Sequence, residues 1–407
     1  MPAGFAAGGR AAGIKPSGRP DVAMIVATAG LAAVAATFTR NLVSAAPVRL
    51  SREHLAATGG RARAVIVTSG SANAATGAPG DADQARIAAY VAAALGCRPD
   101  ETLAASTGLI GTRLPVDAVG QAIGALVAGG LSPDETGLAA ALEAMMTTDS
   151  RRKAASATLE LPGTDGLART VRVTGIVKGV GMIHPNMATM IAVVLTDAAV
   201  APGTLDDLLR PAVGSSFDML TVDGDTSTND TVFTLASGGS GSAEVLPGAP
   251  AAAALGAALA AVCRSLARQQ AADGEGASTL LTCRVSGAAD ATDARAIARA
   301  VVGSSLLKAA VHGRDPNWGR AAAAAGAATR PDGSPVGLRP EVLRIALCGT
   351  PVFAGQPVVF DAGALSRAMD APEVVFELDL GVGGASAEAW GCDLTEAYVR
   401  ENSEYST

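Results

Sequence analysis

Aromatic residues are scarce in this chain of 407 residues: Phe, Trp and Tyr together make up 3% of it, although 49% of the residues are hydrophobic. Alanine, valine, leucine and glycine must therefore fill the core. Such small side chains suit strands and helices in close backbone contact, so we expect layered elements. The length favours two or three lobes with ample core.

Histidine is also scarce. The three histidines are His54, His184 and His312, and none lies near a Gly-x-Ser-x-Gly segment, which argues against a Ser-His-Asp hydrolase. They also lack the His-Glu-x-x-His spacing of a zinc protease, so we predict no metal site. No Gly-x-Gly-x-x-Gly segment follows a predicted strand, and we expect no dinucleotide site.

The five cysteines are odd in number, widely scattered and without a Cys-x-x-Cys pair. This pattern indicates reduced thiols and a cytoplasmic protein, and it speaks against a structural zinc site. The first fifteen residues have no apolar core of the signal-peptide type. Residues 22–38 are uncharged but rich in alanine and threonine and short for a membrane span, so we predict a buried strand and turn there.

The net charge of −7 argues against a nucleic-acid partner, because phosphate binding needs a basic face. Hydrophobic periodicity predicts an irregular mixture of strands and helices, and hence an α+β fold in layers. We expect strands over 22–26, 64–68, 103–106, 170–177, 190–195, 231–235, 280–285, 343–348, 357–360 and 373–380. We expect helices over 83–95, after Pro115, over 135–146, from a capping box at Thr204 and Asp207, over 252–268 and over 292–302. The least structured linker candidates are 161–167 and 237–250.

Residues 178–197 read KGVGMIHPNMATMIAVVLTD, a glycine- and proline-rich turn followed by an apolar run typical of a buried strand. Thr189 stands at the lip of that strand, where a rigid backbone suits a nucleophile. A threonine needs no histidine if it is N-terminal, because its own α-amino group, with a pKa of about 7.7 to 8, serves as base. That requires cleavage between Ala188 and Thr189. The alternative is that Thr189 is simply a β-branched strand residue.

Seven clusters of Thr, Asn, Asp, Ser and Gly stand out. Each alone suits a turn, but together they favour a shared polar cleft. They occupy residues 73–77, 106–108, 147–149, 223–231, 273–276, 313–320 and 402–407.

These motifs resemble those of the ornithine acetyltransferase family, the bifunctional glutamate N-acetyltransferase / amino-acid acetyltransferase of arginine biosynthesis. Residues 178–190 resemble its self-cleavage segment. The other matching motifs are AAGIKPSG at 11–18, FTRN at 38–41, ANA at 72–74, STGLIG at 106–111, MTTD at 146–149, VDGDTSTNDT at 222–231, DPNWGR at 315–320 and GCDLT at 391–395. They follow the family's order along nearly the whole chain.

The resemblance implies a two-lobed fold similar to N-terminal-nucleophile hydrolases. It implies self-cleavage into an α chain, 1–188, and a β chain, 189–407, associated as an α2β2 heterotetramer. The implied reaction moves acetyl from N-acetylornithine to glutamate by ping-pong through acetyl-Thr189. No cofactor is implied, although acetyl-CoA serves as acetyl donor in bifunctional members.

The resemblance also assigns site residues. Thr189 matches the nucleophile, and Thr107 and Gly108 match the oxyanion-hole pair. Substrate contacts match Thr147, Lys178, Thr189, Glu275, Asn402 and Thr407, with Thr148 as a rival to Thr147. Alternative functions are an amidase or aminopeptidase on the same scaffold, an acetyltransferase of secondary metabolism, and a non-processing binding protein. Neither the use of acetyl-CoA nor the oligomeric state follows from the residues.

Overall fold

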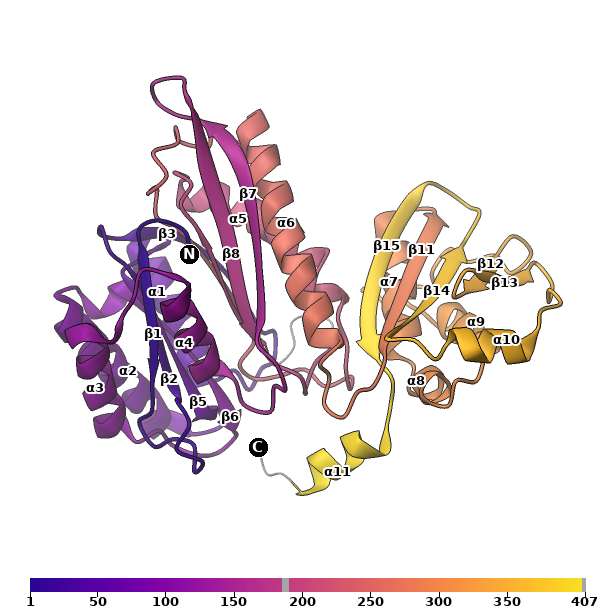
Figure 1. The fold of residues 1–407 in the computed structure, drawn as a ribbon, viewed down its shortest axis with the longest axis horizontal. Helices are drawn as coiled ribbons and strands as arrows, with labels where there is room; N and C mark the ends of the chain where they lie inside the picture. Colours follow the sequence, from indigo (N-terminus) through magenta and orange to yellow (C-terminus); the bar gives the residue numbers. More distant parts are fainter. Residues whose placement is uncertain (185–189, 405–407) are drawn as a thin grey trace.

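The structure, a computed structural model, describes residues 1–184 and 190–404. Figure 1 shows a larger N-terminal lobe and a smaller C-terminal lobe, with helix α11 (Glu396–Glu404) extending from the smaller lobe back toward the larger one. Residues 272–279 lead from one lobe to the other. The predicted α+β class, layered and two-lobed, is confirmed.

Two sheets pack face to face in the larger lobe. The first has the order β1-β2-β5-β6 and the second β4-β3-β10-β9-β8-β7. The first sheet comprises β1 (Phe5–Arg10), β2 (Val22–Ala27), β5 (Ala64–Ser71) and β6 (Thr102–Leu109); the second comprises β3 (Ala32–Phe38), β4 (Arg61–Ala62), β7 (Lys153–Pro162), β8 (Ala168–Lys178), β9 (Ile191–Thr196) and β10 (Thr231–Ala236). The uncharged stretch 22–38 therefore forms two buried strands, one in each sheet, rather than a membrane span.

Strand β9 shows why residues 190–195 are apolar at every position. Ile191, Val193 and Leu195 face the core shared by the two sheets. Ala192 and Val194 face the opposite way, toward helices α5 (Pro202–Gly214) and α6 (Pro250–Ala271). A strand covered on both faces needs no polar positions, so the predicted buried strand is confirmed.

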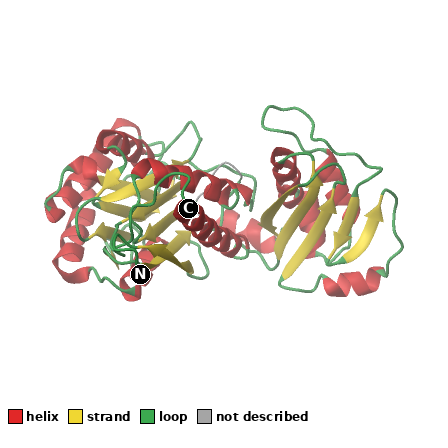
Figure 2. Cartoon of the chain, turned by 90° about the horizontal axis from the view of Figure 1, so that it is seen from above, coloured by secondary structure: helices red, strands yellow, loops and turns green. Residues whose placement is uncertain are grey.

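Helices cover the outer faces of both sheets, which gives the order helix, sheet, sheet, helix in the larger lobe (Figure 2). Helices α2 (Gly77–Leu95) and α3 (Val116–Ala125) cover the first sheet, and α5 and α6 cover the second. The larger lobe also contains α1 (Ala46–Thr58), α4 (Glu135–Met145), the 3-10 turns η1 (Pro99–Glu101) and η3 (Phe217–Met219), and the π-helical turn η2 (Leu126–Gly130).

Helix α6 is, within residues 1–184 and 190–404, the one helix long and apolar enough to cross a membrane. Its apolar face is already used, because Leu255, Leu259, Cys263 and Leu266 are fully buried against the second sheet and α5. The apolar composition therefore reflects core packing.

The smaller lobe is built on a third sheet of order β13-β12-β14-β11-β15. Its strands are β11 (Leu280–Ala288), β12 (Arg344–Leu347), β13 (Thr350–Ala354), β14 (Glu373–Asp379) and β15 (Ala385–Cys392), and its helices are α7 (Ala291–Gly303), α8 (Ser305–His312), α9 (Trp318–Gly326) and α10 (Ala362–Ala368). Trp390 on β15 is fully buried in the core of this lobe.

Three local predictions are wrong. The capping box at Thr204 and Asp207 does not form, because Pro202 starts α5 and Thr204 lies inside the helix. Residues 357–360 make an isolated bridge rather than a strand. Residues 161–167 are no linker, since they end β7 and turn tightly into β8. The other predicted strands and helices are found, with shifted ends.

Candidate active site

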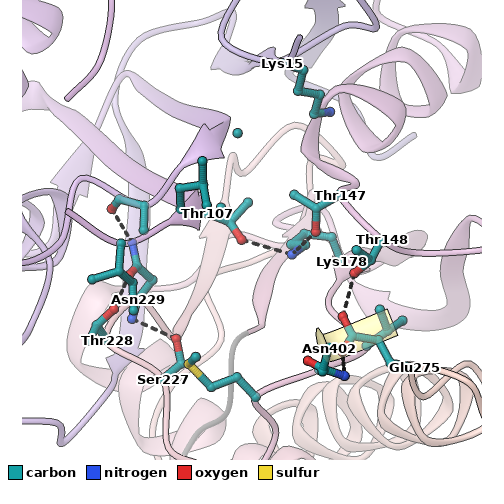
Figure 3. A pocket seen from close by; sticks show the side chains of 18 of the residues that line it. Lys15, Thr107, Thr147, Thr148, Lys178, Ser227, Thr228, Asn229, Glu275 and Asn402 are labelled. Atoms are coloured by element: carbon teal, nitrogen blue, oxygen red, sulfur yellow. Dashed lines mark hydrogen bonds between the residues drawn. The ribbon is translucent and has the colours of Figure 1, made fainter. Parts of the chain in front are cut away.

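A cavity of about 490 Å³ opens beside the ends of β6 and β8, beside helix α11, and beside Glu275 in the segment 272–279 that leads from one lobe to the other. Its size is typical of small-molecule sites. The predicted residues that line it are Thr107, Gly108, Thr147, Lys178, Glu275 and Asn402, together with the rival Thr148. Figure 3 shows side chains from these distant segments pointing into the same space.

Lys178 is the last residue of β8, and its ammonium group lies at the centre of this arrangement. Nζ donates to the hydroxyl oxygens of Thr107, at 3.0 Å, and Thr147, at 2.9 Å. A threonine hydroxyl has one proton to donate. Because Thr107 accepts from Lys178, its own O–H stays available for a group in the cavity.

Gly108 follows Thr107 at the end of β6, with a φ of 123°. A Cβ added there would lie 2.4 Å from the backbone carbon of Gly70 in the neighbouring strand. No real Cβ tolerates that approach, so glycine is required. The close contact brings the backbone of Gly108 to the cavity without a side chain in the way.

Asp149 supports this centre from behind. Its carboxylate accepts from Lys153 Nζ at 2.7 Å and from the N–H groups of Gly179, at 2.8 Å, and Thr147, at 3.1 Å. Burial alone would raise the pKa of Asp149, but the ammonium groups of Lys178 and Lys153 hold the pKa below its usual range. Burial also lowers the pKa of Lys178, against the opposing effect of Asp149.

Glu275 lies on the other side of the cavity. Its carboxylate accepts from the Thr148 hydroxyl at 2.8 Å and from the Asn402 amide at 3.0 Å. Gly181 faces it so closely that an added Cβ would lie 2.3 Å from the carboxylate. Thr147 and Thr148 thus both line the cavity, one beside Lys178 and the other beside Glu275.

Ala188, Thr189 and Thr407 lie outside the described residues. The next described residue after Thr189 is Met190, which is fully buried. Its N–H donates to the carboxylate of Asp230 at 3.1 Å. Burial raises the pKa of Asp230 well above its usual range.

Several further residues line the cavity. Ser227, Thr228 and Asn229, from the segment before β10, belong to the polar cluster 223–231 that was expected in the cleft. Lys15 and Arg19, from the loop after β1, were assigned no role from the sequence. The Asn229 amide donates to the carbonyls of Ala72, at 2.7 Å, and Ser106, at 2.8 Å, and so ties this segment to the end of β6. The motif at 11–18 was the available signal for Lys15.

Two of the polar clusters do not join the cleft, which corrects that prediction. Asn73 is buried and its amide donates to the carbonyl of Gly80, so residues 73–77 hold the start of α2. Residues 313–320 connect α8 to α9 in the smaller lobe, where Trp318 packs on Phe353 with ring centroids 5.3 Å apart. Both clusters therefore support the local fold and do not line the cavity.

Across residues 1–184 and 190–404, no group of three or more His, Cys, Asp or Glu side chains is arranged to hold a metal ion. The cysteines Cys97, Cys263, Cys283, Cys348 and Cys392 are all free thiols. Burial raises the pKa of Cys263 to about 12, so this thiol stays protonated and unreactive.

The chain matches the ArgJ family over residues 6–407. It belongs to this family. The arginine biosynthesis bifunctional protein ArgJ of Symbiobacterium thermophilum is 48% identical and covers 100% of this chain, which covers 98% of that protein. The protein of the same name from Deinococcus radiodurans is 45% identical, with 100% and 98% covered.

A crystal structure of the arginine biosynthesis bifunctional protein ArgJ from Bacillus halodurans matches with a TM-score of 0.50 and 37% sequence identity. The match covers 52% of this chain and 98% of that chain. The resemblance drawn from the motifs is thus confirmed at the level of the family, and with it the expectation of an enzyme.

Proposed function

We propose that this ArgJ family member transfers an acetyl group from N-acetylornithine to glutamate, through an acetyl ester on Thr189. The observation that carries the proposal is the cavity itself. It brings Thr107, Lys178 and Glu275 from three distant segments to one site, and the donors and charges there suit acyl transfer to and from amino acids.

In the first half-reaction, the Thr189 hydroxyl attacks the acetyl carbonyl of N-acetylornithine while the Thr189 amine takes its proton. The Thr107 hydroxyl and the Gly108 N–H stabilise the resulting oxyanion. The carbon–nitrogen bond breaks, the amine of ornithine takes the proton, and acetyl-Thr189 remains. The Lys178 ammonium favours this arrangement, since it occupies Thr107 as an acceptor and leaves the O–H to donate.

In the second half-reaction, the amine of glutamate attacks the ester carbonyl, and N-acetylglutamate leaves as the Thr189 hydroxyl is restored. Thr147, Lys178, Asn402 and Thr407 hold the amino-acid groups of the substrates. Glu275 suits the side-chain ammonium of ornithine, because its carboxylate faces the cavity.

This chemistry requires cleavage between Ala188 and Thr189, giving chains 1–188 and 189–407. The second sheet would hold the two chains together, because β9 pairs with β8 and β10 pairs with β3 across the cut. The Bacillus halodurans chain, which covers about half of this chain, fits such a division. We extend the proposal to an α2β2 assembly in the cytoplasm, with no cofactor and with acetyl-CoA as a further acetyl donor.

Intact mass under denaturing conditions tests the proposal directly. The wild-type protein is expected as two fragments, the larger beginning at Thr189, and Thr189→Ala as a single 40.0 kDa chain without transferase activity. Acetyl transfer from N-acetylornithine is measured beside hydrolysis of small amides. A wild-type protein that stays in one piece, or an active Thr189→Ala variant, would falsify the assignment of the nucleophile.

A further inference from the structure

One side of the cavity is cationic in a way that the catalytic scheme above does not use. Lys15 and Arg19 reach it from the loop that follows β1. Lys15 Nζ donates to the carbonyls of Pro20, at 2.7 Å, and Met146, at 2.6 Å. Figure 3 shows Lys15 on the far side of Thr107 and Thr147 from Glu275 and Asn402.

The loop that carries these cations is held in place. The fully buried carboxylate of Asp21 accepts from the N–H groups of Ala12, at 2.6 Å, Ile14, at 2.7 Å, and Lys15, at 3.1 Å. Three such bonds from one carboxylate fix the backbone of the loop. The position of Lys15 is therefore set by the fold rather than by a freely moving surface segment.

Cationic side chains predominate on this side of the cavity, although Glu143, which does not line it, pairs with Arg19. Lys15, Arg19 and Lys178 are the cationic residues that line it, and Glu275 on the other side is the one acidic residue among the described lining residues. Burial, together with the nearby charges of Arg19 and Lys178, lowers the pKa of Lys15 to about 8 against the opposing effects of Asp21 and Glu143. A bound anion would relieve this repulsion.

The two substrates in the proposed reaction differ in the charge of their side chains. Ornithine carries an ammonium group and glutamate a carboxylate. If both side chains lay beside Glu275, glutamate would place a second carboxylate there, and like charges close together are strongly unfavourable. A cavity with charges of opposite sign on opposite sides removes that conflict.

We propose that Arg19, supported by Lys15, binds the side-chain carboxylate of the glutamate acceptor, while Glu275 binds the side-chain ammonium of the donor. The two half-reactions then use opposite sides of one cavity around the same reacting centre. This inference rests on the proposed function and adds to it the residues that select the acidic acceptor.

Arg19 offers a matched control. Its guanidinium pairs with Glu143 at 2.8 Å, and the guanidinium of Arg152 pairs with the same carboxylate at 3.0 Å. Both arginine side chains are about half exposed, at 48% and 59%, but Arg152 is not among the described residues that line the cavity. Arg19→Gln and Arg152→Gln therefore each remove an ion pair with Glu143, but Arg19→Gln also removes a cation that lines the cavity.

The experiment follows the two half-reactions separately, because kcat/KM for each substrate of a ping-pong enzyme reports on its own half-reaction. In Arg19→Gln, kcat/KM for glutamate is expected to fall about tenfold, as for a partly exposed charge-assisted hydrogen bond. The value for N-acetylornithine should stay within about twofold of wild type. Exchange of labelled ornithine into N-acetylornithine supplies a cationic acceptor for the same acetyl-enzyme, and it should stay equally unchanged.

Arg152→Gln should leave all three rates close to wild type, and Glu143→Gln should raise kcat/KM for glutamate by freeing Arg19 from its competing carboxylate. Circular dichroism melting checks that each variant is folded. Equal losses with glutamate and with ornithine as acceptors, or an unchanged rate with glutamate, overturn the inference. A wild-type protein that transfers no acetyl group to either acceptor would instead refute the proposed function.

Discussion

Replacing Thr107 by valine tests the role of its hydroxyl while keeping the packing of β6 nearly unchanged. Thr107 is 1% exposed, and valine keeps its branched shape while it replaces the hydroxyl by a methyl group. The change removes the O–H that we assign to the oxyanion, and it removes one of the two threonine acceptors of Lys178. Thr147 remains as the other acceptor, so Lys178 keeps a partner.

The expected loss follows from the chemistry of oxyanion stabilisation. Removing one donor typically reduces kcat by about 10²- to 10³-fold, or about 2.7 to 4 kcal/mol. Because both half-reactions pass through an oxyanion on the same carbon, kcat/KM should fall to a similar extent for N-acetylornithine and for glutamate. A donor that acts in the transition state changes kcat and kcat/KM together.

The assay uses purified protein whose cleavage has been scored by intact mass, with rates expressed per cleaved chain. Thr107→Ser keeps the hydroxyl and serves as the control, with activity expected within about tenfold of wild type because one lost methyl group costs roughly a kcal/mol. A cleaved and folded Thr107→Val protein that retains a third of the wild-type kcat would refute the role of this hydroxyl.

Further predictions concern charged groups. Glu275→Gln should raise KM for N-acetylornithine about tenfold or more, because a neutral amide replaces the carboxylate that we assign to its ammonium; steady-state kinetics measure this, and an unchanged KM contradicts the assignment. Lys153→Met should lower the free energy of unfolding by about 3 to 5 kcal/mol in urea titration, since it leaves the buried carboxylates of Asp149 and Asp273 without their shared cation. The pKa of Lys15 is about 8 in the folded protein against 10.5 in an unfolded chain, so the folded chain loses this proton first as pH rises. The stability of the wild type relative to Lys15→Met should therefore rise from pH 8 toward pH 10. A difference in melting temperature between the two proteins that is the same at every pH would exclude this effect.

Hydrophobic periodicity predicted the elements whose apolar residues are large. The apolar run of β9 and the leucine spacing of α6 are examples. Strand β7 was missed although it alternates, because two of its more buried positions are alanines, Ala155 and Ala157, which give only a weak hydrophobic signal. Helix α1 was also missed, although Pro47 near its start and Gly59 after its end are sequence signals of a helix.

Motif reasoning found most of the described polar residues of the cavity, but it could not place them relative to one another. Thr107, Lys178 and Glu275 are far apart in the chain, and they meet because the ends of β6 and β8, from different sheets, and the segment 272–279 border the same cavity. Arg19 was missed because nothing local marks it. Its role depends on the loop held by Asp21, which is a tertiary feature.

The strand register bears on the cleavage that we propose before Thr189. Lys178, the last residue of β8, pairs directly with Ile191, the first residue of β9. From this pair the ladder continues as far as Val173 opposite Thr196. Cleavage before Thr189 therefore leaves all of these strand pairs intact. In sequence, the proposed new chain end lies two residues before Ile191, and Ile191 pairs with Lys178, whose Nζ donates to Thr107. The antiparallel pairing therefore sets the described start of β9 opposite the lysine that orients Thr107, as the proposed mechanism requires.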